Sequence, residues 1–313
     1  MIRPAMFGLG SLILKWFSLL KDGILRYYKI RKKVFMDIID ISVDSSKAVR
    51  PFNHFYRAIG YASVDITYTP PARRMFDYLS SYHRHAEFVR MHSILTPHGR
   101  GDHYFRTTGE GFNFPRVDEE PHWDRLVDCD NEENISYDWS LVDRVYDVLV
   151  EHNMRPIVET MGVPWCLRRE DVRDQNFHLP RDYKQWRQLM RDFTPHCQDP
   201  YGAEEVARWY FEIWNEPDGV EFWRTRPETL YALYDYMVDG VQSVNPKARV
   251  GGPATMQGQA ALAVFDGFLQ HCTDGVNFAT GGWGARLDFI SVHCKGGEPH
   301  GIPSPSMPEL FNT

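Results

Sequence analysis

One glutamate in this sequence follows an aromatic, strand-like segment and is the residue best suited to acid–base chemistry. The segment Phe211 to Asp218 reads FEIWNEPD, so an apolar run leads into Asn215, Glu216 and a proline. Proline cannot donate to a sheet, so it ends the strand and leaves Glu216 at the tip. A carboxyl group beside apolar rings ionises less readily than one in water. We therefore predict that Glu216 is a general acid and that Asn215 binds a substrate hydroxyl. The alternative is a turn in which these residues only end the strand.

Polar residues end two other apolar runs and are expected to share this site. Arg90 and His92 close one run, and His293 and Lys295 close another. In each pair the residues are two positions apart, so on a strand they face the same side. A lysine at this place suits a substrate carboxylate, with which it forms a charge-assisted hydrogen bond. We expect all four residues to bind substrate.

Alternatives remain open for these residues and for two further glutamates. Arg90 would hold the substrate, pin active-site carboxylates or bond buried backbone carbonyls. Glu159 is expected either to be a polar residue at the tip of another strand or to be a buried partner of Arg90. Glu212 alternates onto the face of Glu216, one layer deeper, and is expected to be structural. His293 and Lys295 would otherwise be a structural histidine and a surface lysine.

The elements that position these residues alternate between strand-like and helix-like patterns. Strand-like segments cover 88–95, 155–161, 209–214, 248–252 and 287–294, and helical patterns cover 72–83, 137–152, 183–193, 227–244 and 260–272. Such alternation predicts an α/β fold with a parallel sheet, either doubly wound or closed into a barrel. No GxGxxG motif follows a strand and no P-loop occurs, so a nucleotide-binding sheet loses support. Polar residues at several strand ends favour a (β/α)8 barrel.

Several of these segments together resemble the clan-A glycoside hydrolases, and more narrowly glycoside hydrolase family 39, which contains α-L-iduronidases and β-xylosidases. FYRAIGY at 55–61, FVRMHSIL at 88–95, FEIWNEPD and VGGPA at 250–254 are similar to the first, second, fourth and fifth barrel strands of the family. LQHCTDGVNFATG at 269–281 and LDFISVHCKG at 287–296 resemble the α-L-iduronidase branch. The resemblance implies a TIM barrel of which about the first six β/α units are present.

The same resemblance implies a retaining glycosidase, which uses two carboxylates about 5–5.5 Å apart. Glu216 would be the acid/base, and the nucleophile would be a glutamate at the tip of the seventh strand. Since a βαβ unit takes roughly 30 residues or more, that strand is expected beyond residue 313. Glu298 and Glu309 are the glutamates that follow the sixth strand, and neither has a strand-like context. The resemblance implies no cofactor and no metal.

The expected function is therefore α-L-iduronidase-like hydrolysis of terminal uronic-acid or related sugar residues, because the iduronidases carry a similar His-x-Lys at the position of His293 and Lys295. A β-xylosidase of the same family is the alternative within the enzyme class. An inactive barrel fragment or a non-catalytic sugar-binding protein is the alternative of another class.

Composition and charge indicate an ordinary globular protein. The 313 residues are 43% hydrophobic and 25% charged, which excludes a largely disordered chain. A formal net charge of −7 disfavours a nucleic-acid partner. The carbohydrate substrate expected here is what the family resemblance implies. Five cysteines without a CxxC pair indicate thiols or at most one disulfide, and no zinc ribbon.

Residues 1–35 differ from the rest and are expected to form an N-terminal apolar and basic extension, with residues 36–313 forming the incomplete TIM-barrel domain. Met6 to Leu20 is apolar except for Lys15, but it is shorter than the roughly 20 residues that a membrane span needs. A basic stretch follows it, which is the wrong charge order for a signal peptide. An amphipathic extension is favoured over a signal anchor, and a cytoplasmic location over a secretory or anchored one. The oligomeric state stays open.

Overall fold

The computed structural model describes residues 57–61, 64–82, 86–96, 126–130, 134–169, 179–220 and 222–294. The chain divides into two units, Met1–Asn53 and His54–Thr313, and every described residue belongs to the second. The extension expected over residues 1–35, and Lys295, Glu298 and Glu309, lie outside the described residues.

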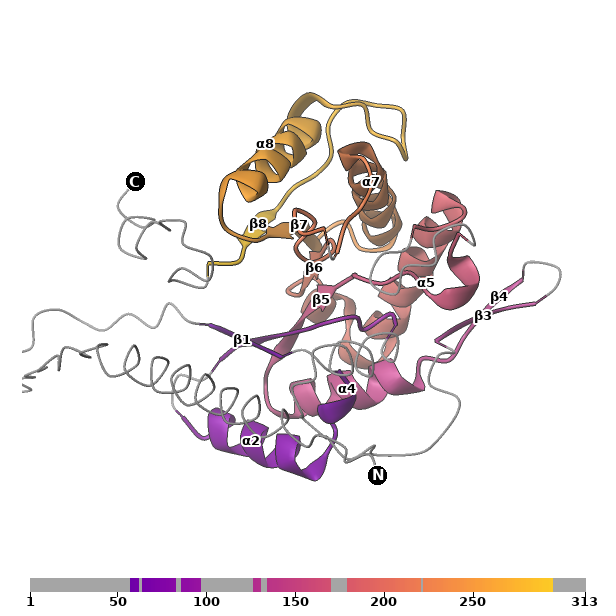
Figure 1. Ribbon diagram of the computed structural model, residues 1–313. Helices are drawn as coiled ribbons and strands as arrows, with labels where there is room; N and C mark the ends of the chain where they lie inside the picture. Colours follow the sequence, from indigo (N-terminus) through magenta and orange to yellow (C-terminus); the bar gives the residue numbers. More distant parts are fainter. Residues whose placement is uncertain are drawn as a thin grey trace, which may run out of the picture. The chain divides into compact units, whose positions relative to one another are not determined.

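Six parallel strands form the centre of the described structure, as Figure 1 shows. They pair in the order β1, β2, β5, β6, β7, β8, so each strand lies beside the next one along the chain. A doubly wound sheet would reverse its strand order at a switch point, which this sheet does not do. The sheet therefore advances in one direction, as the wall of a (β/α)8 barrel does. The bounds are β1 (Ala58–Tyr61), β2 (Phe88–Met91), β5 (Arg155–Glu159), β6 (Tyr210–Glu212), β7 (Arg249–Thr255) and β8 (Phe289–Val292).

Helices connect the strands and cover the sheet with their apolar faces. The longer helices are α2 (Pro70–Ser80), α4 (Ser140–Glu151), α5 (Tyr183–Tyr201), α7 (Pro227–Val244) and α8 (Gln259–Asp274), and α6 (Ala203–Val206) is a single turn. Helix α7 has the bounds predicted from the sequence, and its first residue is a proline, whose fixed φ suits that position. Helix α5 begins after Asp182, whose side chain accepts a hydrogen bond from the backbone N–H of Lys184.

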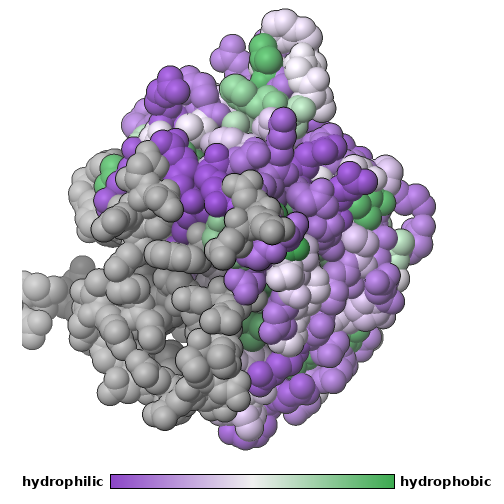
Figure 2. Space-filling model, turned by 90° about the vertical axis from the view of Figure 1, so that its right-hand side faces the viewer, coloured by the Kyte–Doolittle hydropathy of each residue, from purple (hydrophilic) through white to green (hydrophobic). Residues whose placement is uncertain are grey.

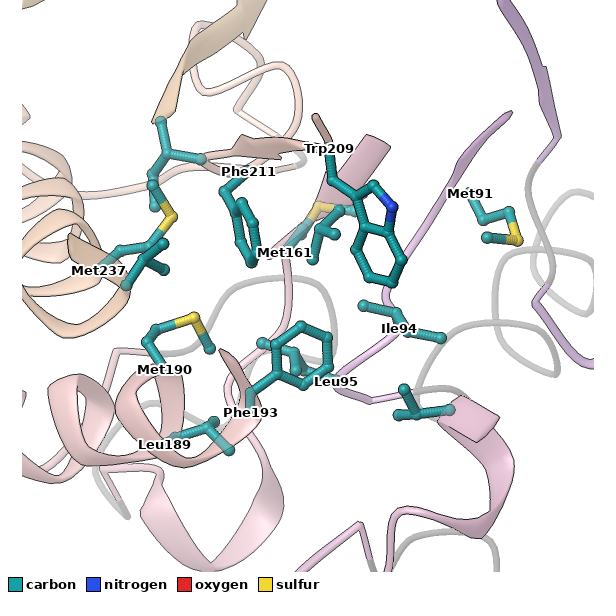
Figure 3. Close-up of a cluster of buried hydrophobic side chains, with 14 of the residues drawn as sticks. Met91, Ile94, Leu95, Met161, Leu189, Met190, Phe193, Trp209, Phe211 and Met237 are labelled. Carbon is teal, nitrogen blue, oxygen red and sulfur yellow. The ribbon is translucent and has the colours of Figure 1, made fainter. Parts of the chain in front are cut away.

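The core lies where the helices pack on the sheet, and large side chains fill it (Figure 3). Phe211 of β6 is fully buried and meets Phe193 of α5 edge to face, with ring centroids 6.4 Å apart. Met237 of α7 and Met161, which follows β5, are fully buried in the same cluster. Because these side chains come from both layers, they fix how the helices lie on the strands and so where the strand ends lie.

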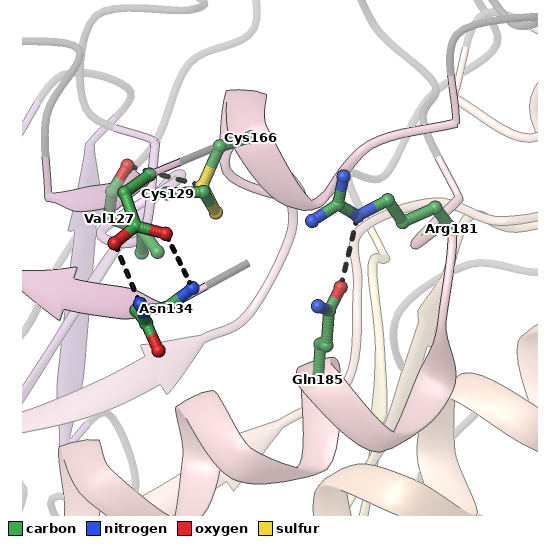
Figure 4. Close-up of a disulfide and its surroundings, with 7 residues drawn as sticks. Val127, Cys129, Asn134, Cys166, Arg181 and Gln185 are labelled. Atoms are coloured by element: carbon green, nitrogen blue, oxygen red, sulfur yellow. Dashed lines mark hydrogen bonds between the residues drawn. A yellow bond between two sulfur atoms is a disulfide. The ribbon is translucent and has the colours of Figure 1, made fainter. Parts of the chain in front are cut away.

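A short antiparallel hairpin, β3 (Val127–Cys129) and β4 (Ile135–Tyr137), lies outside the main sheet and was not predicted. A disulfide joins its Cys129 to Cys166 in the 3-10 turn η2 (Trp165–Leu167), as Figure 4 shows. The Cys166 sulfur lies 3.6 Å from the backbone carbonyl oxygen of Val127, and it carries no hydrogen to donate because it is in the disulfide. Cys197, Cys272 and Cys294 form no disulfide in the described structure, which agrees with the prediction of at most one disulfide.

Hydrophilic residues dominate the described surface on the face drawn in Figure 2, with hydrophobic residues gathered at its upper end. The connection between α8 and β8 lies at that end in Figure 1. Val276, Phe278 and Trp283 in this connection are 51%, 45% and 78% exposed. None of the described helices is both long and apolar enough to cross a membrane.

Candidate active site

The candidate site lies where the carboxyl ends of the sheet strands meet, and Glu216 is at its centre. Strand β6 ends at Glu212, and the chain then turns so that Trp214 and Glu216 have φ values of 56° and 48°. This left-handed conformation costs a non-glycine residue about 1–3 kcal/mol. Such backbone strain persists only where the surroundings hold it. Here the backbone N–H of Glu216 donates to the carbonyl of Ala254 over 2.9 Å, and the Trp214 indole donates to the carbonyl of Phe222 over 3.0 Å.

Glu216 is buried to 7% exposure and pairs with a histidine from the last strand of the sheet. A hydrogen bond joins its Oε1 to Nδ1 of His293 over 2.8 Å. His293 follows β8, and its side chain is 22% exposed, so the pair is reachable from one side. Sequence reasoning placed both residues at the site but assigned His293 to the substrate. The contact between them could not be predicted, because it joins strands 77 residues apart.

Arg90 of β2 crosses to β6 and fixes two residues of the FEIWNEPD segment. Its Nε donates to Oε2 of Glu212 over 2.5 Å, and its Nη2 donates to Oδ1 of Asn215 over 3.0 Å. Burial lowers the pKa of Arg90, but the carboxylates of Glu212, Glu159 and Glu216 outweigh this and raise its pKa above the ordinary value. Of the interactions considered for Arg90, the structure shows a hydrogen-bonded ion pair with a buried carboxylate, that of Glu212. Glu212 has the structural position predicted for it.

Glu159 at the end of β5 forms a second buried carboxylate, and its partners differ from the one suggested by the sequence. Its Oε1 lies 3.2 Å from Nδ1 of His92, and its Oε2 accepts the backbone N–H of Ser93 over 2.6 Å. Burial raises the pKa of Glu159, but His92, Arg90 and the Ser93 N–H outweigh it and hold the pKa below the ordinary value. Its hydrogen bonds therefore go to His92 and Ser93, and Arg90 acts on it only by charge.

Asp218 belongs to the same turn and was not singled out in the sequence, although it is the last residue of the FEIWNEPD segment. Its Oδ1 accepts the backbone N–H of Met256 over 2.9 Å. Burial and the neighbouring charge of Glu216 raise its pKa, while the Met256 N–H and His293 act in the opposite direction. The turn thus carries two carboxyl groups close to His293, of which one is tied to the backbone after β7.

The arrangement combines a buried carboxyl group that shares a hydrogen bond with imidazole, an oriented amide and a fixed cation. These groups suit proton transfer to and from a bound oxygen atom. In the described part of the chain, no three His, Cys, Asp or Glu side chains gather as the ligands of a metal ion would. Lys295, the remaining predicted site residue, lies outside the described residues.

Comparison with known proteins identifies the family. A profile of the Glycosyl hydrolases family 39 matches residues 39–309. The chain belongs to this family. A β-xylosidase of Geobacillus stearothermophilus is 36% identical over 174 residues, which are 54% of this chain and 32% of the relative. The α-L-iduronidase of Canis lupus familiaris is 27% identical over 271 residues, which are 82% of this chain and 36% of the relative.

Solved family 39 structures share the fold. A bacterial orthologue of human α-L-iduronidase superposes with a TM-score of 0.60 at 28% identity, over 84% of this chain and 37% of that one. A monomeric β-xylosidase from Caulobacter crescentus CB15 superposes with a TM-score of 0.58 at 23% identity, over 86% of this chain and 49% of that one. The six parallel strands are thus part of a TIM barrel, as predicted. The chain spans about a third of the length of the Geobacillus and canine relatives.

Proposed function

We propose that this chain carries the acid/base half of a retaining glycoside hydrolase site, with Glu216 as the acid/base. The observation that supports the proposal most directly is the buried Glu216 carboxyl, at the carboxyl end of the sheet, hydrogen-bonded to His293 over 2.8 Å. In a retaining reaction this carboxyl protonates the glycosidic oxygen as the bond to the leaving group breaks. It then takes a proton from the water that releases the sugar from the enzyme.

The groups around Glu216 have separate roles in this proposal. Arg90 donates to Oδ1 of Asn215, so the amide presents Nδ2 as the donor to a sugar hydroxyl. His92, held by Glu159, serves a second hydroxyl. Glu159 and Glu212 are 0% and 3% exposed and already bonded, so neither is proposed as the nucleophile. We assign that role to a carboxylate on a later barrel strand.

The role of Glu216 is tested by comparing leaving groups in a form of the protein that includes the later strand assigned to carry the nucleophile, and the kinetic measurements below use the same form. Glu216→Gln removes the acidic proton but keeps the side chain's shape, so glycosides with poor leaving groups should lose about 100-fold or more in kcat/KM. Aryl glycosides with activated leaving groups need little protonation and should lose much less in the step that forms the glycosyl-enzyme. Glu228→Gln, at an exposed position in the first turn of α7, is the matched control and should keep the parent rates. Equal losses for both substrate types would contradict the assignment.

For the substrate we propose a terminal α-L-iduronide or a related uronide, since the iduronidase relative aligns over 82% of this chain. If Lys295 binds the sugar carboxylate, its charge-assisted hydrogen bond contributes about 1.5–3 kcal/mol. Lys295→Ala should then lower kcat/KM for an aryl α-L-iduronide by roughly 10- to 150-fold and barely change that for an aryl β-D-xyloside. A parent that prefers the xyloside, with Lys295→Ala changing neither rate, would favour the β-xylosidase alternative, which the 36% identity to the Geobacillus enzyme supports.

A non-catalytic role is the alternative of another class, and calorimetry separates it from the enzyme. If the form that includes the later strand hydrolyses neither glycoside but binds iduronate or xylose with Glu216→Gln unchanged in affinity, it is a sugar-binding protein. If it neither hydrolyses nor binds them, the inactive-fragment alternative holds.

A further inference from the structure

An irregularity in β7 lies beside the candidate acid. Pro253 pairs with Ser291 and Thr255 pairs with Val292, so Ala254 is one extra residue, a β-bulge, in the pairing with β8. Its φ of 53° is left-handed, which non-glycine residues adopt rarely. A strained bulge next to a site is a feature that needs support from its neighbours.

The bulge holds both partners of the Glu216–His293 pair by their backbones. The carbonyl of Ala254 accepts the N–H of Glu216 over 2.9 Å. The carbonyl of the next residue, Thr255, accepts the N–H of His293 over 2.7 Å. Two adjacent carbonyls of one strand thus anchor two residues that come from the strands on either side. The distance between the carboxyl and the imidazole therefore depends on the shape of the bulge.

One side chain compensates for the hydrogen bond that the bulge removes from the sheet. The N–H of Ala254, as the extra residue, has no place in the regular ladder, and Oγ of Ser291 accepts it over 3.1 Å. We propose that Ser291 is a positioning residue of the active site, which acts through the Ala254 bulge to set Glu216 and His293 against each other. This inference rests on the proposed role of Glu216, because Ser291 would set the position of the Glu216 carboxyl relative to His293.

An isosteric pair of variants separates the hydroxyl from the shape of the side chain. Ser291→Thr keeps a hydroxyl, and Ser291→Val replaces it with a methyl group of similar size; both are β-branched residues that suit a strand. Ser291→Ala repeats the comparison without added bulk, so a folding defect in one variant does not leave the inference undecided. Ser243→Ala in α7 is the matched control, since its hydroxyl also bonds to the backbone, at the carbonyl of Gly240.

The first measurement does not need activity. In 15N-labelled protein, the amide signals of Glu216 and His293 should both move in Ser291→Val and Ser291→Ala, and should stay near their parent positions in Ser291→Thr and in the control. Spectra of Glu216→Gln and His293→Gln assign the two signals. If Ser291→Val and Ser291→Thr give the same positions for both signals, the inference is wrong.

The second measurement is the ratio of kcat/KM between an activated aryl glycoside and a glycoside with a poor leaving group. Ser291→Val should widen this ratio by about tenfold over Ser291→Thr, a part of the roughly 100- to 10,000-fold that acid–base catalysis contributes. A merely structural defect lowers both rates together and leaves the ratio unchanged, which would overturn the positioning role. If the parent form that includes the later strand hydrolyses neither substrate, the proposed function fails, and the amide signals alone decide the role of Ser291.

Discussion

At the scale of single residues, the site depends on buried charges that are paired across strands. The sequence predicted that Glu216, Asn215, Arg90, His92 and His293 lie at strand ends, because each closes an apolar run. It was not sufficient to say which of them meet. Arg90 and Glu212 are 122 residues apart in sequence, and only the packing of β2 near β6 brings them together.

Removing only one charge of the Arg90–Glu212 pair should destabilise the protein much more than removing both. Their side chains are 16% and 4% exposed, so Arg90→Met leaves a buried carboxylate without its partner. We expect a loss of about 3–5 kcal/mol in the free energy of unfolding. Adding Glu212→Gln should recover much of that loss, because no unpaired charge then remains. Urea denaturation measures the free energy of unfolding of the single and the double variant. A double variant as unstable as Arg90→Met would contradict the argument.

At the scale of elements, the sequence predicted long amphipathic segments well and short or interrupted ones poorly. Helix α7 was predicted with its correct bounds, whereas α5 continues past the predicted end at Phe193 to Tyr201, with Pro195 and Pro200 inside it. Proline disfavours a helix interior, but tertiary contacts outweigh this, since Cys197 is buried and the Tyr201 hydroxyl donates to Asp147. The hairpin strands β3 and β4 have three residues each, too few to show an alternating pattern.

Close packing of α7 on α5 makes Gly240 a position where an added methyl group should be harmful. A Cβ at Gly240 would lie 2.6 Å from the carbonyl oxygen of Arg187 and 2.8 Å from Cβ of Met190. Gly240→Ala should lower the free energy of unfolding by about 1–3 kcal/mol, despite alanine's better helix propensity. Gly267→Ala in α8 is the control, because its Cβ meets only the movable hydroxyl end of Tyr231, and it should be neutral or stabilising. Thermal unfolding of both variants checks this, and equal effects would contradict it.

At the scale of the whole molecule, the described sheet is a curved wall of a barrel whose two outer strands are β1 and β8. The alternating pattern and the polar strand ends sufficed to predict this architecture, since they reflect the two-layer packing that every β/α unit needs. An incomplete barrel also predicts that its two outer strands are edges, which the described sheet has at β1 and β8. Ile290 and Val292 of β8 are 57% and 55% exposed.

Strand β8 should therefore drive self-association of the chain. Within the described residues it pairs on one side only, with β7, and an edge strand with exposed apolar side chains is a template for pairing with another chain. We expect the apparent mass in sedimentation velocity to rise with protein concentration, and the double variant Ile290→Lys/Val292→Lys to reduce that rise, since charged side chains on an edge oppose pairing. Leu262→Lys is the control: Leu262 is 52% exposed but lies on α8, so its replacement should leave association unchanged. A parent chain that stays monomeric over the whole concentration range would show that this edge is already protected. An equal effect of Leu262→Lys would show that association depends on net charge rather than on the strand.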